Sequence, residues 1–481
     1  MTLAVLILSG AIAGQAPVAP LVSPASEVTA ALADAKRLPV ELATRTRYVS
    51  MYSVPPADRG EFVKVFAFWS NSLSREAELV KPRRVTDTLL AVVLDDYGWT
   101  PDVWEKLGDV DPYFHVRLKI TSGQTYRFFH RGGVYGRNTL TPGWYEEPST
   151  AKDATVSALA PWLPERPVRE LSVLTLSACP VVRADWWLST TAIQAGRKGV
   201  GYYDWLGLKK RADFEALVGL DIEASKKVKR EVAGIVSRSG VSQLPRQIFR
   251  YQSITGGVWQ TRDVLDDNVD ARNALRQLDG DFKHQAEEWY SFLPNGLFAY
   301  YLSDQDGKQQ ETAPDKLGRD STSTSNDGRI HVGLSCVRCH AEGIKPIADW
   351  ARTVYQGDVQ LTSPDYVKLK RLRQLYLSDL AGKVERDAGE FAETVAKVNG
   401  LKLADNAKTF ARVVAAYQES DHGPAEVARQ LGTTEAKLLD ALRPIKLLDP
   451  ILSGLLQVPP VPLRIEDLEQ LYPLLAGYVR E

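Results

Sequence analysis

The chain has 481 residues, of which 44% are hydrophobic and 25% are charged, and its formal net charge is −1. These values are typical of a globular protein with up to about three domains. The near-zero charge argues against a nucleic acid or an anionic membrane surface as a partner.

The N-terminal segment has the features of a secretory signal. Residues 3–13 form an apolar run that is too short to span a bilayer, and small residues follow it. No Lys or Arg precedes the run, which departs from the usual signal pattern. We predict a signal peptide over 1–16, a linker over 17–44, and a periplasmic or otherwise extracytoplasmic protein that keeps no membrane span after cleavage.

An N-terminal α+β domain is predicted from residue 45 to 290. Apolar side chains recur with helical spacing over 62–73, and the continuous apolar run at 89–94 favours a buried strand. Two further β patterns, 116–120 and 125–129, flank Ser-Gly and predict a hairpin.

The second half of this domain is predicted to be largely helical. Asp221 can cap a helix that continues to about Gly240. An aromatic set could form ordinary core or wall a cofactor pocket, and we favour core. His115 and His130, at the open end of the predicted hairpin, are interpreted as structural rather than as ligands. The aromatic set is Trp186, Trp187, Tyr202, Tyr203 and Trp205.

One motif, Cys336-Val337-Arg338-Cys339-His340, indicates a specific chemical function. The C-x-x-C-H pattern is typical of the attachment of a c-type haem. In a helical turn, Cys336 and Cys339 share one face, so both sulfurs can reach the two vinyl groups of one porphyrin. His340 follows directly and can bind the iron as its proximal ligand. We predict one covalently attached haem c.

Two other interpretations of the cysteine pair are weaker. Half of a zinc site would need further ligands, and Cys179 is the only other thiol. A redox dithiol would follow a strand, whereas the polar stretch 321–328 precedes this pair. Because the neighbours of Cys179 are apolar, it is predicted to be a small buried hydrophobe.

After the haem-binding segment, 291–350, the chain is predicted to be helical from 351 to 481. Apolar periodicity is clear over 381–398, 409–417 and 425–442, and no strand pattern intervenes. The predicted fold class is therefore α+β, mainly α-helical.

Several stretches together resemble the secreted cytochrome c domain proteins of planctomycetes. The resemblance covers about residues 45–350 and implies a haem cofactor without naming a reaction. By position, it implies that Cys336 and Cys339 attach the haem and that His340 binds the iron. The stretches are 63–75, 96–99, 111–115, 183–187, 201–207, 253–257, 293–302 and 331–340.

The sixth iron ligand stays open at this point. Small cytochromes c use a methionine downstream of the motif, but this chain has methionine only at Met1 and Met51. Met51, a histidine such as His422, or an open iron are the alternatives. His422 is more simply a surface loop residue near a helix start. His331, only five residues before Cys336, is poorly placed to reach the other haem face.

These observations predict an exported monohaem cytochrome that transfers single electrons between extracytoplasmic redox partner proteins. A haem enzyme of peroxidase type, with an open distal side, is the first alternative. A non-catalytic interaction protein with a structural haem is the second. No catalytic triad, phosphate-binding loop or dinucleotide fingerprint supports another chemistry.

Overall fold

The computed structural model confirms a mixed α+β fold that is mainly helical. No helix among the described residues is both long and apolar enough to cross a membrane. The predicted signal peptide lies outside those residues. The structure describes residues 22–120, 125–130, 143–148, 154–160, 162–228, 231–236, 244–264, 283–317, 320, 328–340, 343–351, 373–376, 378–419, 421–446 and 448–480.

A four-stranded sheet, in the order β2-β3-β1-β8, forms the centre of the N-terminal part. Strand β1 (Thr46–Ser50) pairs antiparallel with β3 (Leu89–Val93) and parallel with β8 (Val181–Arg183). Strand β2 (Arg83–Arg84) is the exposed edge. The continuous apolar run predicted to be a buried strand is β3, because all but its last residue are fully buried.

Three helices, α3 (Arg59–Ser72), α6 (Ala184–Thr191) and α14 (Leu403–Gln418), pack together beside this sheet. The indole of Trp69 on α3 donates to the Thr191 hydroxyl at 2.8 Å, and its ring lies 4.9 Å from Phe410 on α14. The helix predicted around residues 62–73 is confirmed as α3.

The aromatic side chains of the N-terminal part form one buried cluster. Trp99 lies 4.3 Å from Tyr97, 4.8 Å from Trp205 and 5.7 Å from Trp187, measured between ring centroids. Edge contacts continue to Trp104. All five predicted aromatic residues are buried in this core.

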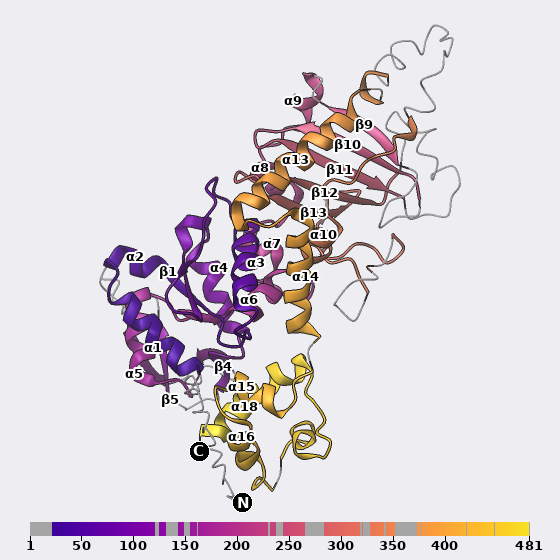
Figure 1. The fold of residues 1–481 in the computed structure, drawn as a ribbon. Helices are drawn as coiled ribbons and strands as arrows, with labels where there is room; N and C mark the ends of the chain where they lie inside the picture. The colour runs from indigo at the N-terminus through magenta and orange to yellow at the C-terminus, as the bar shows by residue number, and fades with distance from the viewer. Residues whose placement is uncertain are drawn as a thin grey trace, which may run out of the picture.

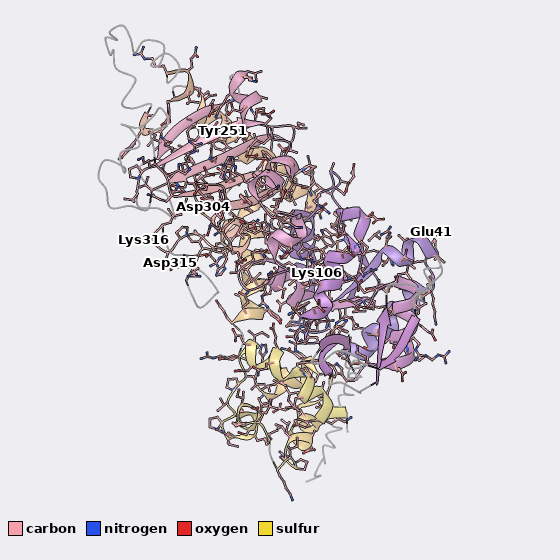
Figure 2. All side chains as sticks on the ribbon, turned by 180° about the vertical axis from the view of Figure 1, so that it is seen from behind. Glu41, Lys106, Tyr251, Asp304, Asp315 and Lys316 are labelled. Carbon is pink, nitrogen blue, oxygen red and sulfur yellow. The ribbon has the colours of Figure 1, made fainter. Side chains whose placement is uncertain are left out.

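A five-stranded antiparallel sheet, in the order β13-β12-β11-β10-β9, occupies the other end of the molecule (Figures 1 and 2). Figure 2 shows Tyr251 of β10 and Asp304 of β13 there, well away from Glu41 of α2. The helical prediction for this region is wrong: the helix capped by Asp221 ends at Lys227, and strands follow. The strands are β9 (Val232–Val236), β10 (Arg246–Gln252), β11 (Gly257–Asp263), β12 (Ala286–Phe292) and β13 (Phe298–Asp304).

Helix α13 (Leu380–Asn399) lies across one face of this sheet (Figure 1). Gly234 and Gly257 permit the close approach, since a Cβ atom would lie 2.5 Å from Leu380 at the first and 2.0 Å from Asp387 at the second. Phe391 stacks on Phe298 at 3.9 Å. The helix predicted over 381–398 is confirmed as α13.

The predicted linker is partly wrong, because α1 (Pro24–Ala35) and α2 (Val40–Arg45) fold within it and α1 packs on β1 and β3.

The predicted hairpin is also wrong in its pairing. Strand β4 (His115–Ile120) pairs with β7 (Ala154–Leu159), and β5 (Thr125–His130) pairs with β6 (Gly143–Pro148). Other helices are α4 (Pro101–Glu105), α5 (Glu165–Thr175), α7 (Tyr202–Leu206), α8 (Arg211–Leu217), α9 (Ile222–Lys227), α10 (Leu334–Cys339), α15 (Pro424–Gln430), α16 (Glu435–Leu442), α17 (Pro450–Ser453) and α18 (Ile465–Arg480), with 3-10 turns η1 (Leu94–Tyr97), η2 (Lys106–Asp109) and η4 (Gly454–Leu456).

Candidate functional site

The predicted motif forms the short helix α10, whose start is fixed by Gly333. This residue has φ +86°, and a Cβ atom there would lie 2.5 Å from the carbonyl oxygen of Ala192. The next amide, of Leu334, donates to that same oxygen at 2.8 Å. Helix α10 is thereby held against the C-terminal end of α6.

Replacing Gly333 with alanine should destabilise the fold and displace α10, because both the backbone angle and the space require glycine. A strained backbone of this kind costs about 1–3 kcal/mol. Urea unfolding monitored by tryptophan fluorescence measures the loss. Gly389→Ala is the matched control, since Gly389 lies inside α13 with no atom near a new Cβ, and alanine there should add up to about 1 kcal/mol. Equal changes in the free energy of unfolding for Gly333→Ala and Gly389→Ala would contradict the requirement for glycine at position 333.

Cys336 and Cys339 lie one helical turn apart on α10, so their side chains share one face. Cys336 is buried and Cys339 is half-buried, and both are free thiols. Burial raises the pKa of both thiols, that of Cys336 well above its ordinary value. A reactive dithiol needs a lowered thiol pKa and exposure, so this pair does not match a redox dithiol.

His340 ends α10 and is held in one orientation. Its amide donates to Cys336 at 2.9 Å, and its Nδ1–H donates to the carbonyl oxygen of Gly343 at 3.2 Å. This hydrogen bond leaves the lone pair on Nε2, which has no hydrogen-bond partner among the described residues. Burial lowers the pKa of His340, so the imidazole is neutral, as a metal ligand must be.

Two tyrosines from the five-stranded sheet form the wall against His340. Tyr290 on β12 and Tyr300 on β13 are directly opposite each other in the sheet, and their rings lie 4.7 and 5.7 Å from the imidazole. Strand β13 is kept in place at its outer edge, because its amides at 300 and 302 donate to the hydroxyls of Tyr202 and Tyr203. The sequence analysis did not assign Tyr290 and Tyr300 to the site.

A buried charged cluster lies on the same sheet face. Glu288, two residues before Tyr290, lies 3.3 Å from the Arg246 guanidinium, which also pairs bidentately with Asp263. The Glu288 carboxylate opposes the lowering of the His340 pKa by burial. The positive charges of Arg246 and Lys345 act in the opposite sense to Glu288 and lower the pKa of His340.

His422, considered as a sixth ligand, lies at the far end of α14 from the motif. Leu403, the first residue of α14, is adjacent to Gly343, whereas His422 follows the last turn (Figure 1). The 16 residues of this helix span about 24 Å. The prediction that His422 precedes a helix is confirmed, but it is buried, not at the surface.

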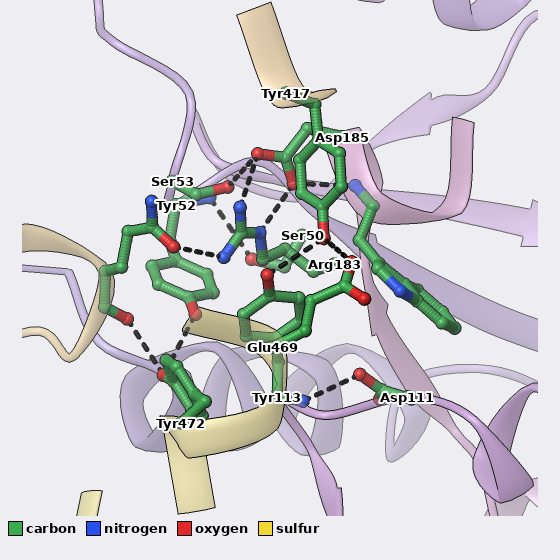
Figure 3. Close-up of polar contacts among 12 residues, drawn as sticks. Ser50, Tyr52, Ser53, Asp111, Tyr113, Arg183, Asp185, Tyr417, Glu469 and Tyr472 are labelled. Carbon is green, nitrogen blue, oxygen red and sulfur yellow. Dashed lines mark hydrogen bonds and ion pairs between the residues drawn. The ribbon is translucent and has the colours of Figure 1, made fainter. Parts of the chain in front are cut away.

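His422 belongs to a separate buried polar network around Arg183, whose contact with Asp185 is drawn in Figure 3. Arg183 pairs with Asp185 and donates to the amide oxygen of Gln430 at 2.7 Å. The Gln430 amide nitrogen therefore donates to Nδ1 of His422 at 3.0 Å. This fixes the ring proton of neutral His422 on Nε2, which leaves that nitrogen no lone pair for a metal.

The same network borders a cavity of about 360 Å³. Its guanidinium groups are already balanced by carboxylates: Arg183 by Asp185, Arg429 by Glu426 and Arg412 by Asp58 and Glu61. Sequence reasoning missed this cavity because its walls come from three distant segments, 53–62, 183–185 and 412–430. Its lining includes Ser53, Phe62, Ala416 and Tyr417.

Met51 is also remote from the motif. It is fully buried and its amide donates to Thr88. Two residues later, the Ser53 hydroxyl donates to Asp185 at the start of α6, whereas α10 contacts the opposite end of that helix. Met51 and His422 thus lie at the same end of the three-helix layer, away from His340.

His115 has a structural position, as predicted. Its Nδ1 lies 2.9 Å from a carboxylate oxygen of Asp111 and its Nε2 lies 3.0 Å from the carbonyl oxygen of Ala178. Both nitrogens therefore donate, which requires the protonated ring. Burial opposes this charge, but the Asp111 carboxylate raises the pKa of His115 well above 6.5. The side chain of His130 lies outside the described residues.

This protonated ring predicts a pH dependence of stability. Below about pH 6.5 both the folded and the unfolded chain bind the proton, so the contribution of His115 is complete. As pH rises toward the raised pKa, the unfolded chain loses the proton first and the free energy of unfolding falls. Urea unfolding at pH 6 and pH 8.5 should show a smaller decrease for His115→Gln than for the unchanged chain. An identical decrease would contradict the charged ring.

Cys179 is a fully buried free thiol, as predicted. Burial raises its pKa to about 11. Its backbone carbonyl accepts the indole N–H of Trp104 at 2.7 Å. Cys179 is therefore a packed, neutral side chain rather than a nucleophile.

No family model, curated protein or solved structure matches this chain. The resemblance to secreted cytochrome c domain proteins therefore stays a prediction. Among the described residues, no group of three or more His, Cys, Asp or Glu side chains could hold a metal ion by itself. A haem brings four nitrogen ligands of its own, and then one imidazole and two thiols are the protein groups required. Cys336, Cys339 and His340 have the spacing, burial and tautomer that fit this group.

Proposed function

We propose that this chain carries one haem c, bound covalently through Cys336 and Cys339 with His340 as the proximal iron ligand. In this proposal it is exported and transfers single electrons between extracytoplasmic redox partner proteins. The haem supplies the iron that changes oxidation state. The chain attaches it, orients the imidazole and shields it from water.

The observation that carries the proposal is the orientation of His340. A metal-binding histidine usually donates its other ring N–H to a carbonyl or carboxylate, which fixes the tautomer and the ring plane. His340 makes this bond to Gly343, and Tyr290 and Tyr300 enclose its ring. Its Nε2 makes no hydrogen bond among the described residues, and it therefore keeps a lone pair that could bind a metal.

Burial supports an electron-transfer role over simple storage of the cofactor. The sheet and the helices α10, α13 and α14 surround the site, and Cys336 and His340 are nearly inaccessible to solvent. Burial of this kind is one of the features by which a protein sets the reduction potential of a haem.

The test is production of the full chain in a bacterium that attaches haem c in its periplasm. We expect a mass increased by one haem, haem that stays on the chain after denaturation and acid extraction, and a reversible one-electron redox titration. Recovery of the unmodified chain from cells that load a control cytochrome would contradict attachment. Covalent haem without reversible redox behaviour would favour the structural-haem alternative.

A further inference from the structure

The positions of the histidines and methionines decide whether a second protein side chain can bind the iron opposite His340. Electron-carrying c-type haems usually complete the iron with a second histidine or a methionine. The whole chain contains 6 histidines and 2 methionines. Met1 falls in the predicted signal, and Met51 and His422 lie at the far end of the helix layer, as described above.

Two further histidines are engaged elsewhere. Both ring nitrogens of His115 face oxygen atoms. His284 lies 2.8 Å from the Glu287 carboxylate. Side chains alternate between the two faces of a strand, so Glu287 is on the sheet face opposite Tyr290 and His340. The strand that carries His130, β5, pairs with β6 and lies far from α10 (Figure 1).

His331 is the histidine nearest to the motif in sequence, but its backbone is bound to α10, the same helix that carries the two thiols. Its amide donates to the Ser335 hydroxyl at 3.0 Å, and its carbonyl accepts the Ser335 amide at 3.1 Å. These bonds fix the backbone of His331 to the first turn of α10, the helix that carries both thiols. A sixth ligand must come from the opposite porphyrin face, which this short tether does not reach.

We propose that the iron position opposite His340 is open and binds an uncharged diatomic ligand of the carbon monoxide and nitric oxide class. This inference rests on the proposed haem attachment. The burial of the site selects the class, because Cys336 and His340 are nearly inaccessible to solvent. A charged ligand would lose its hydration on entering, whereas a neutral diatomic meets no such penalty.

The consequence is that the protein responds to a ligand as well as to electrons. Binding at the iron stabilises one oxidation state over the other, so the ligand would shift the reduction potential of the haem. The redox function and the ligand site would then be coupled through the haem iron.

The test is a carbon monoxide titration of the reduced, haem-loaded full chain, followed by its absorption spectrum. We expect a saturable shift of the main haem band, and the same shift in Met51→Leu and His422→Gln. A low-spin spectrum that carbon monoxide leaves unchanged would overturn the open site. So would the appearance of carbon monoxide binding only after Met51, His422 or His331 is replaced, and that variant would identify the internal ligand.

The two proposals fail in distinguishable ways. A chain that carries no covalent haem contradicts the proposed function and this inference with it. A chain that retains haem through denaturation, yet ignores carbon monoxide, contradicts the open site alone. Spectra before and after denaturation of the same sample separate the two results.

Discussion

Simultaneous replacement of Cys336 and Cys339 with alanine should abolish covalent haem attachment. The two thiols lie one turn apart on α10, and no other cysteine adjoins them, since Cys179 lies in the N-terminal core. Without either sulfur, any haem held by His340 is bound by coordination alone. Acid extraction after denaturation should then remove all of it, which the absorbance of the protein fraction measures directly.

Single replacements and an unrelated cysteine provide the controls. Cys336→Ala or Cys339→Ala should each leave one thioether, and so retain haem with an unreduced vinyl group that shifts the reduced absorption band. Cys179→Ala should retain full attachment, because that thiol is buried elsewhere. Loss of haem from Cys179→Ala, or its retention in the double variant, would contradict the assignment.

The sequence was most informative where structure is decided locally. The C-x-x-C-H motif forms a helical turn with both cysteines on one face, as its spacing predicts. Helices α3 and α13 carry regular apolar periodicity, and β3 is a continuous apolar run. Each of these segments has its own signal, and the structure bears it out.

Strands β9 to β12 of the five-stranded sheet were not predicted, because many of their polar residues point inward. Period-2 alternation identifies a strand when its polar face meets water. Here Arg250 is buried beneath α13, where it pairs with Asp387. Arg246 is buried beside Glu288 and pairs with Asp263. The partner of Arg250 is 137 residues away, so no local window contains the reason for its burial.

The surroundings of the motif are equally non-local. Tyr290 and Tyr300 precede His340 by 50 and 40 residues and come from two paired strands. Gly343 was unremarkable in sequence, but its carbonyl orients the imidazole and its position lies against α13 and α14. The candidate ligands could be identified from the sequence, whereas the residues that hold them in place are brought together only by the tertiary fold.

Replacing Asp387 with alanine should cause the largest loss of stability. This carboxylate is fully buried on α13 and accepts three hydrogen bonds, two from Arg250 and one from the Trp259 indole, at 2.8–3.0 Å. Alanine leaves the Arg250 charge buried without its partner, which costs about 3–5 kcal/mol in comparable cases. The free energy of urea unfolding measures the loss.

An exposed ion pair provides the control, because it shows the effect of removing a carboxylate that is not buried. Asp440 pairs with Arg443 at 2.6 Å, and both side chains are more than half exposed. Asp440→Ala should therefore cost about 0–1 kcal/mol. Asp387→Asn, which keeps the shape and some hydrogen bonds, should fall between the two. Similar losses for Asp387→Ala and Asp440→Ala would mean that Arg250 finds water or another partner.

The position of Asp387 also connects this prediction to the site. Its neighbour Ala388 lies against Gly343, whose carbonyl holds the His340 ring. If α13 loosens when the buried pair is broken, the imidazole loses part of its support. Asp387→Ala should then show a haem spectrum that changes at lower urea than global unfolding, whereas Asp440→Ala should show one coincident transition. Coincident transitions in both variants would limit the role of Asp387 to global stability.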